Sequence, residues 1–301
     1  DPRPVSGLRR FHPQSGTAFA DEIDVDLKLD EGLPEAVQVI TLAEDSIPAK
    51  SAILMDQQSG RVLFEQNADE PVAPASITKI MTLLLVIEAL EEGKISLEDK
   101  VVTSELAASM GGSQIWLEPG EEMTVDELLR AVAIASANDA SVALAEHVAG
   151  SEPAFIERMN KRAAQLGMQN TRFLNCTGLD EEGHVTTARD VAIVSRELIS
   201  HPMIIEYSTI WMDELRNGET QLVNTNKLVR FYPGATGLKT GTTSIAGSCL
   251  SATATRDGLS LVAVVMGAPN SDSRFAAARG LLDYGFADYV SVTPPSIADR
   301  L

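Results

Sequence analysis

Cysteine, histidine and aromatic residues are scarce in this sequence. Its 301 residues include 2 cysteines, 4 histidines and only 5% aromatic residues. Cys176 and Cys249 are too few for the disulfide frameworks of small secreted domains, and the sequence leaves open whether they are free thiols or one bridge. No cysteine–histidine cluster has zinc-binding spacing and no His-Glu-x-x-His motif occurs. We therefore predict neither a metal nor another cofactor.

Basic residues and long apolar runs are also in short supply. The chain has 24 Lys and Arg against 43 Asp and Glu, a net charge of −19. Nucleic acids and anionic membrane surfaces both require a basic surface, so we expect no nucleic-acid partner and no unaided membrane docking. No apolar run approaches the roughly 18 residues of a transmembrane helix. With 44% hydrophobic residues, the composition is globular.

The two ends of the chain differ from its middle. Residues 1–46 combine an arginine-bearing leader with a strongly acidic segment, and this composition predicts disorder. The string Ala18-Phe19-Ala20 resembles a signal-peptidase site, although no apolar segment precedes it. Residues 47–286 are predicted to form one folded domain. Residues 287–301 are predicted to be a tail that begins a linker or a second domain.

Strand patterns occur near both ends of the predicted domain. Apolar runs at 52–56 and 62–65 predict a β-hairpin. Runs at 248–254 and 259–267 predict two further strands, and a final helix is expected over residues 273–284, stopped by Gly285.

Helical patterns fill the region between these strands. Apolar residues at 3–4 spacing over 77–90 predict a helix that is buried on all sides. Three further helices are predicted to begin at capping residues, Thr124, Ser151 and Thr187. The sequence thus predicts an α/β protein of the α+β type, with an antiparallel sheet flanked by helices and an inserted all-helical subdomain.

The first chemical motif is Ser76-Ile77-Thr78-Lys79, at the start of the buried helix. Serine is a poor nucleophile until a base removes its proton, and Lys79 lies on the same helix face. Lysine acts as a base only when its pKa falls from the reference value of about 10.4. The motif alone also fits a helix cap with a surface lysine, but the apolar stretch 80–87 makes a surface lysine unexpected here.

Two further short motifs place polar side chains close together in the sequence. Ser136-Ala137-Asn138 separates two predicted helices, and Lys239-Thr240-Gly241-Thr242 adjoins a predicted strand. Taken alone, the first motif also fits residues that cap helices or form turns, and the second fits polar residues at the start of a strand. The second is not a phosphate-binding loop, because Leu238 separates Gly237 from Lys239.

Together and in this order, the three motifs resemble the Ser-x-x-Lys, Ser-x-Asn and Lys-Thr-Gly signature of serine penicilloyl transferases. The chain resembles the low-molecular-mass penicillin-binding proteins, which are serine-type D-Ala-D-Ala carboxypeptidases, from about Ala52 to Phe286. The matching strings are Pro74-Ala-Ser-Ile-Thr-Lys-Ile-Met81, Ser136-Ala-Asn-Asp-Ala140, Asn175-Cys-Thr-Gly-Leu179, Thr187-Ala-Arg-Asp190 and Gly237-Leu-Lys-Thr-Gly-Thr242.

The resemblance implies a β-lactamase/DD-peptidase-like fold and an acyl-enzyme mechanism. Ser76 would remove the terminal D-alanine from a peptidoglycan stem peptide, and β-lactams would acylate the same serine. Lys79 would act as the base, and Ser136 would pass a proton to the leaving nitrogen. The residues implied in substrate binding are Asn138, Lys239, Thr240, Gly241, Thr242 and Arg274.

The resemblance also assigns these residues individual roles. Asn138 would bind a peptide carbonyl, Lys239 would help to keep Lys79 neutral, and Thr240 would bind the terminal carboxylate. The backbone N–H groups of Ser76 and Thr242 would form the oxyanion hole. Arg274 stands where the family has an arginine facing the carboxylate, although a surface arginine at a helix start is the alternative.

Two features depart from the family pattern. One branch of the family has histidine where this chain has Thr242, which affects the side chains available for deacylation. Family members also continue into a β-rich second domain and a C-terminal membrane anchor, whereas this chain stops at Leu301. We expect an exported, extracytoplasmic protein whose membrane association depends on an anchor that this chain lacks.

Three other functions remain as alternatives. A class A-like β-lactamase requires a Glu-x-x-x-Asn loop, and Glu181 and Glu182 do not stand in that pattern. A Ser-His-Asp hydrolase is disfavoured because Gly-x-Ser-x-Gly is absent and His184 is predicted to lie on the surface. A non-enzymatic penicillin-sensing or wall-binding module is the third alternative, which release of D-alanine would exclude.

Overall fold

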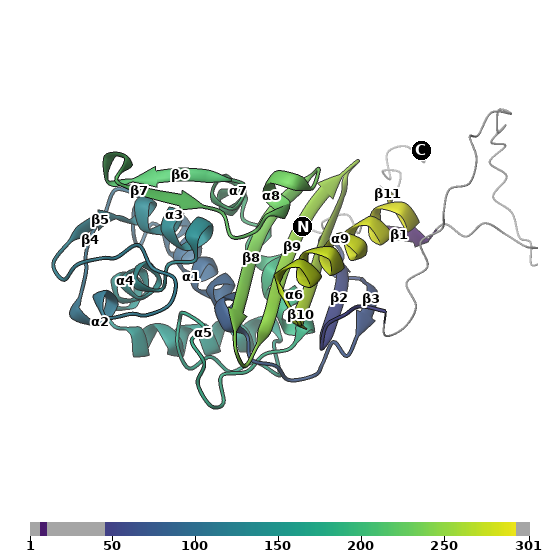
Figure 1. Cartoon of the computed structure of the whole chain (residues 1–301), viewed down its shortest axis with the longest axis horizontal. Helices are drawn as coiled ribbons and strands as arrows, with labels where there is room; N and C mark the ends of the chain where they lie inside the picture. Colours follow the sequence, from purple (N-terminus) through teal and green to yellow (C-terminus); the bar gives the residue numbers. More distant parts are fainter. Residues whose placement is uncertain (1–6, 11–45, 293–301) are drawn as a thin grey trace, which may run out of the picture.

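The computed structural model describes residues 7–10 and 46–292, and its largest sheet has five antiparallel strands (Figure 1). The order across the sheet is β3-β2-β10-β9-β8. The strands are β2 (Ser51–Asp56), β3 (Val62–Gln66), β8 (Ala235–Thr243), β9 (Gly247–Arg256) and β10 (Leu259–Ala268). The sheet combines an N-terminal hairpin with C-terminal strands, which confirms the predicted arrangement.

Both faces of this sheet are covered, so even the short strand β2 is buried along its whole length. Alternate residues of a strand point to opposite faces. Ile53 and Met55 pack into the core shared with the helical region, whereas Ala52 and Leu54 pack beneath the C-terminal helix α9 (Ser271–Asp288). Strand β8 forms the sheet edge nearest the helical region (Figure 1).

The segment between β3 and β8 contains most of the helices and two small antiparallel sheets of two strands each. Its helices are α1 (Lys79–Glu91), α2 (Glu105–Ala108), α3 (Val125–Ala135), α4 (Asn138–Ala149), α5 (Glu152–Leu166), α6 (Ala188–Ile199), α7 (Pro202–Ser208) and α8 (Leu228–Phe231). One sheet pairs β4 (Lys100–Val102) with β5 (Glu122–Thr124), and the other pairs β6 (Met212–Leu215) with β7 (Thr220–Val223). The prediction of an all-helical insertion was therefore wrong in this respect, because strands of 3 or 4 residues are too short to show an alternating pattern in the sequence.

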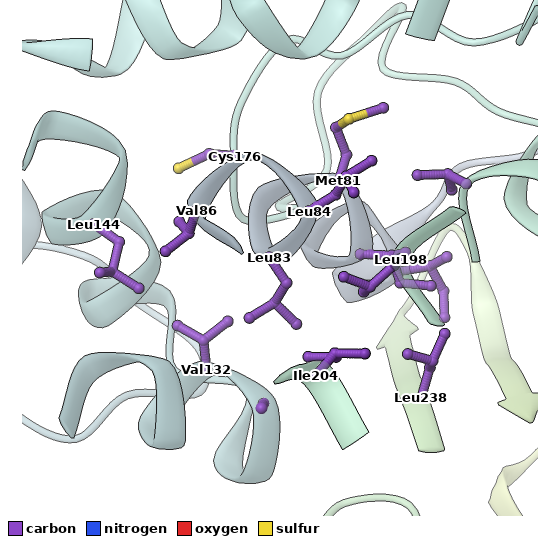
Figure 2. Close-up of a cluster of buried hydrophobic side chains, with 14 of the residues drawn as sticks. Met81, Leu83, Leu84, Val86, Val132, Leu144, Cys176, Leu198, Ile204 and Leu238 are labelled. Atoms are coloured by element: carbon purple, nitrogen blue, oxygen red, sulfur yellow. The ribbon is translucent and has the colours of Figure 1, made fainter. Parts of the chain in front are cut away.

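Helix α1 lies at the centre of the larger core, as the apolar run 80–87 predicted. Figure 2 shows side chains on different faces of α1 meeting residues from several surrounding elements. Leu83 and Val86 are at most 2% exposed, and the partners in this view include Val132 from α3 and Leu238 from β8. Because α1 is surrounded, a lysine in its first turn is necessarily buried.

The predicted helix caps are confirmed. Thr124 accepts a hydrogen bond from the backbone of Glu127, whose side chain accepts one from the Thr124 N–H, which together form a capping box. Ser151 and Thr187 cap α5 and α6 in the same manner through their hydroxyl groups. These caps fix the starts of helices that the hydrophobic pattern alone locates only approximately.

The predicted end of the last helix was wrong. Helix α9 begins after its N-cap Asn270 and continues through Gly285 to Asp288. A Cβ on Gly285 would lie 2.5 Å from Leu261 Cδ1 and 3.0 Å from Leu54 Cδ2. This glycine therefore permits close packing of the helix on the sheet instead of ending the helix.

The predicted terminal segments fall only partly within the described residues. Residues 7–10, predicted to be disordered, form strand β1 (Gly7–Arg10), which pairs with β11 (Tyr289–Val292) of the predicted tail. The pairing satisfies backbone groups that composition alone does not reveal. Residues 1–6, 11–45 and 293–301 lie outside the described residues. Among the described helices, none is long and apolar enough to cross a membrane.

Candidate active site

Ser76 lies in a single 3₁₀ turn, η1 (Ala75–Thr78), which leads directly into α1. The preceding residue, Ala75, has a φ of 49°, which is uncommon for a residue with a side chain. A Cβ on Gly178 would lie 1.8 Å from the carbonyl oxygen of Ala75, and a Cβ on Gly241 would lie 2.9 Å from the nitrogen of Ser76. Two glycines therefore allow two separate segments to approach the backbone at Ser76.

Lys79 is fully buried and faces Ser76. Its Nζ lies 2.8 Å from Ser76 Oγ and 2.7 Å from the carbonyl oxygen of Thr177. Burial lowers the pKa of Lys79 to about 7, against the opposing effects of Cys176 and Asp139. A substantial fraction of Lys79 is consequently neutral near pH 7, as a base for Ser76 must be.

The Thr177 carbonyl also orients the amine. A neutral amine has two N–H donors and one lone pair. When one N–H donates to Thr177, the lone pair of Lys79 can accept the proton of the Ser76 hydroxyl, which lies within hydrogen-bond distance. The geometry therefore suits proton transfer from serine to lysine.

The second motif lies at the junction of α3 and α4. Ser136 ends α3 with a φ of 62°, and Asn138 is the first residue of α4. The backbone N–H of Asn138 donates to the carbonyl of Ser113 at 2.7 Å, and its Nδ2 donates to the carbonyl of Gly111 at 2.7 Å. Its Oδ1 is buried and has no partner among the described residues, so it is an unused acceptor.

The third motif lies within β8, a strand over Ala235–Thr243 that was not predicted from the sequence, since the motif was expected to precede a strand beginning at residue 248. Lys239 is 1% exposed, and its Nζ donates to the carbonyl of Thr240 at 3.0 Å. Burial lowers the pKa of Lys239 well below its usual value, and repulsion from Lys79 and Arg274 lowers it further. The expected role of Lys239 as a fixed positive charge is thus weakened, and burial dominates the pKa of Lys79.

A threonine pair connects the second and third motifs. Thr240 donates its hydroxyl to Thr225 Oγ1 at 2.7 Å, and the Thr225 N–H donates to the carbonyl of Ile134 near the end of α3. This link joins β8 to the segment that carries Ser136. Within the described residues, no hydrogen bond joins the Ser136 side chain to Ser76, Lys79 or Lys239.

Arg274 is buried, which excludes the surface alternative for this residue. It reaches β8 from the start of α9, and its Nη1 donates to the carbonyl of Gly241 at 3.0 Å and to Thr242 Oγ1 at 2.8 Å. Its Nε is buried and has no partner in the described chain. Arg274 therefore braces the end of β8, next to the residues expected to bind the substrate.

The structure adds residues that motif spacing did not identify. Asp139, fully buried, accepts hydrogen bonds from the backbone of Ile115 and Leu117. His184 was wrongly predicted to lie on the surface; it is 5% exposed, and its Nε2 lies 2.9 Å from Thr78 Oγ1. Its Nδ1 accepts the N–H of Leu174, and burial lowers its pKa to about 4.

These additional residues gave only weak signals in the sequence. Thr177 and Gly178 fall within a string that carries the family resemblance, which marks the segment but not the backbone carbonyl that contacts Lys79. His184 stands among polar residues, and nothing local indicates that its ring turns inward. Tertiary contacts with η1 and Phe173 account for its burial.

One group of metal-ligand residues occurs within residues 46–292, and it lies apart from Ser76. It consists of Glu88, Glu197 and His201. Arg162 Nη2 lies 2.6 Å from a carboxylate oxygen of each glutamate. Glu88 follows Ser76 by 12 positions along η1 and α1, about 18 Å at helical rise. None of these three residues belongs to the candidate active site around Ser76.

The chain matches a known protein family and its curated members over the region that contains this site. Residues 38–270 match the peptidase S11 family model, described as D-alanyl-D-alanine carboxypeptidase. The chain is 52% identical over 244 residues to D-alanyl-D-alanine carboxypeptidase DacF of Bacillus subtilis, covering 80% of this chain and 63% of that protein. It is 41% identical over 261 residues to DacC of Escherichia coli, covering 84% and 65%. The chain thus spans slightly less than two thirds of these curated relatives.

Solved structures give the same result. Penicillin-binding protein 5 from Haemophilus influenzae aligns with a TM-score of 0.78 at 36% identity, over 82% of this chain and 73% of that chain. Penicillin-binding protein D2 from Listeria monocytogenes, in its ampicillin-bound form, aligns with a TM-score of 0.74 at 32% identity, over 81% and 100%. The chain belongs to the peptidase S11 family of D-alanyl-D-alanine carboxypeptidases.

Proposed function

We propose that this protein is a serine-type carboxypeptidase that removes the terminal D-alanine from peptidoglycan stem peptides. The observation that carries the proposal is the 2.8 Å contact between Ser76 Oγ and the buried amine of Lys79. A buried amine with a pKa of about 7 has few structural uses, because burying it costs free energy. Activation of the adjacent serine as a nucleophile gives this buried amine a chemical role.

The proposed acylation step begins with attack of Ser76 Oγ on the carbonyl carbon between the two D-alanines. Lys79 takes the serine proton, and the developing oxyanion accepts hydrogen bonds from the backbone N–H groups of Ser76 and Thr242. The C–N bond then breaks, and the departing D-alanine nitrogen receives a proton by way of Ser136. The product is an ester on Ser76, which water hydrolyses.

Substrate binding is proposed to use the free edge of β8. An extended peptide can add to an unpaired strand edge through main-chain hydrogen bonds. Thr240 and Arg274 are proposed to hold the terminal carboxylate. That anion would favour the charged form of Lys239, whose pKa is low in the free site because of burial and neighbouring positive charge. Asn138 was expected to bind a peptide carbonyl, but its Nδ2 already donates to Gly111, and its unused buried acceptor Oδ1 is proposed to receive a substrate N–H instead.

A second proposed property is acylation of Ser76 by β-lactams. The relative from Listeria, penicillin-binding protein D2, is described in ampicillin-bound form and shares this fold. A β-lactamase would also need a loop carboxylate that activates water at Ser76. Here Asp180 accepts a hydrogen bond from Thr243, and Glu181 accepts one from Asn175. Neither carboxylate hydrogen-bonds to Ser76 or Lys79 within the described residues, which favours a penicillin-sensitive peptidase over a β-lactamase.

The proposed site of action is outside the cytoplasm, because the stem peptide of mature peptidoglycan is found there. The matching relatives are bacterial D-alanyl-D-alanine carboxypeptidases. We propose peptidoglycan as the macromolecular partner, with any membrane association supplied by segments beyond the described residues.

The test combines intact-mass spectrometry with an assay for released D-alanine. The protein is incubated with benzylpenicillin, and separately with a short peptide ending in D-Ala-D-Ala. We expect a penicilloyl adduct of one benzylpenicillin per protein that lasts minutes. With the peptide, we expect one D-alanine to be released for each peptide consumed. Both should be absent in Ser76→Ala and retained in Ser200→Ala, which changes an exposed serine at the end of α6.

Each other outcome identifies one alternative. Rapid consumption of penicillin without a lasting adduct would indicate a β-lactamase. A stable adduct without release of D-alanine would indicate a penicillin-sensing module. An adduct that persists in Ser76→Ala would refute the role assigned to Ser76.

A further inference from the structure

Trp116 is held in an exposed and strained conformation in a segment that bonds to Asp139, the residue after Asn138. Its side chain is 75% exposed, the largest exposed fraction among the large apolar side chains of the described residues. Its φ is 60°, a left-handed value that is unfavourable for a residue with a side chain. Backbone strain of this kind persists where the surrounding structure fixes it, and functional sites are a common setting.

The two neighbours of Trp116 fix its backbone. Ile115 and Leu117 are 3% and 4% exposed, so both side chains are anchored in the core. Their N–H groups donate to the carboxylate of Asp139, with distances of 3.1 Å from Ile115 and 3.0 Å from Leu117 to Oδ2. Arg216 also donates to the carbonyl of Ile115 at 2.8 Å. The segment is therefore clamped on both sides of an indole ring that points outward.

The same clamp joins Trp116 to the substrate-binding residues. Asp139 directly follows Asn138 at the start of α4. Asn138 in turn contacts the carbonyl groups of Gly111 and Ser113 through its side chain and its backbone. The segment that presents Trp116 is thus fixed to the residue proposed to bind the stem peptide.

The stretch of chain that carries the ring has no ionisable side chain of its own, although Arg216 and Asp139 bond to its backbone. The stretch 109–117 reads Ser-Met-Gly-Gly-Ser-Gln-Ile-Trp-Leu and contains no ionisable side chain, in a protein of net charge −19. Its exposed or half-buried members include Ser113 and Gln114. Just beyond it, Glu118 is exposed and would disfavour contact with an anionic membrane. Trp116 makes no ring or cation–ring contact within the described chain.

We propose that Trp116 binds the carbohydrate portion of the polymer that carries the stem peptide. Sugar rings present a C–H face that packs on an indole, and their hydroxyl groups suit neutral partners such as Ser113 and Gln114. The fixed ring avoids the entropic cost of ordering a flexible side chain on binding. This inference rests on the proposed function, because it concerns a part of the same substrate that lies beyond the scissile bond.

The test compares two substrates that share one pentapeptide. One carries an N-acetylmuramoyl-containing disaccharide at its amino end, and the other carries an acetyl group there. The measured quantity is the ratio of kcat/KM on the disaccharide peptide to kcat/KM on the acetyl peptide. We expect Trp116→Ala to lower this ratio about fivefold or more, as expected for loss of an aromatic stacking contact, and Trp116→Phe to recover part of it.

Trp211→Ala is the matched control. Trp211 is half-buried, and its ring packs against Phe231 and Arg230. Its replacement should leave the ratio at the wild-type value. An unchanged ratio in Trp116→Ala, or an equal loss on both substrates, would overturn the carbohydrate contact. If the wild-type protein cleaves neither substrate, the proposed function fails and not this inference alone.

Discussion

The low pKa of Lys79 leads to a quantitative prediction for the rate of acylation. Only neutral Lys79 can take the Ser76 proton, and its pKa is about 7 because the amine is buried. The neutral fraction therefore rises about tenfold between pH 6 and pH 8 and then levels off. A lysine of ordinary pKa would give about a hundredfold rise over the same range and no plateau below pH 9.

The sign of the effect follows from the charge. Burial disfavours the ammonium form, so the folded-state pKa lies below the unfolded value, and active enzyme is gained as pH rises through about 7. The assay is the second-order rate of acylation by a β-lactam, measured by stopped flow or quenched intact mass between pH 5.5 and pH 9.5. Circular dichroism at each pH verifies that the protein remains folded.

Lys239→Arg separates the two buried amines. Arginine keeps a positive charge at this position and does not titrate in the range of the assay. If the rise in acylation rate near pH 7 persists in this variant, it reports the titration of Lys79. The added fixed charge should move that rise to lower pH. A limb that disappears in Lys239→Arg, or a wild-type rate that does not level off by pH 9, would refute the assignment.

Three further predictions concern stability and the geometry around Ser76. Gly285→Ala should lower the free energy of unfolding in urea by about 1–3 kcal/mol, because its Cβ would contact the sheet, whereas Gly280→Ala in the same helix should raise it by up to about 1 kcal/mol. Gly178→Ala should reduce β-lactam acylation far more than Gly183→Ala, which has the same φ of 88° but no backbone neighbour. Wild-type protein should lose about 2–3 kcal/mol of stability between pH 7 and pH 4.5 through His184, because the unfolded ring binds a proton that the buried ring does not, and His184→Gln should lose less.

Each of these expectations has a contradicting result. Equal destabilisation by the two α9 substitutions would mean that close packing does not explain Gly285. Equal acylation rates for the two loop variants would show that contact with the Ala75 carbonyl is unimportant. Matching pH profiles for wild-type protein and His184→Gln would show that His184 is not the group protonated on acid unfolding.

Much of the fold could be predicted because local rules and tertiary structure agree. The apolar stretch 80–87 indicated a helix buried all round, and α1 is surrounded in the core. Capping residues such as Thr124 located helix starts, since their hydrogen bonds are local. The contact between Ser76 and Lys79 also followed from local geometry, because both lie within one turn of chain.

Other features could not be predicted because they depend on distant segments. Gly285 looked like a helix stop, yet its role is set by Leu261 on another element. His184 looked exposed because its sequence neighbours are polar, but its ring bonds with Thr78 across 106 positions. The Thr177 carbonyl that orients Lys79 is a backbone group, and side-chain motifs carry no information about it.

The pairing of β2 with β10 has a consequence for how the protein acquires activity. Ile53 pairs with Val264, about 200 residues later in the chain, and Ser76 is enclosed by Gly178 and by β8. Closing such a large loop is entropically costly, and folds rich in distant pairings form slowly. During synthesis or translocation, Ser76 would therefore emerge long before its surroundings exist. Labelling by a fluorescent penicillin should then appear only when the last strands have docked, which makes acylation a direct kinetic probe of completed folding.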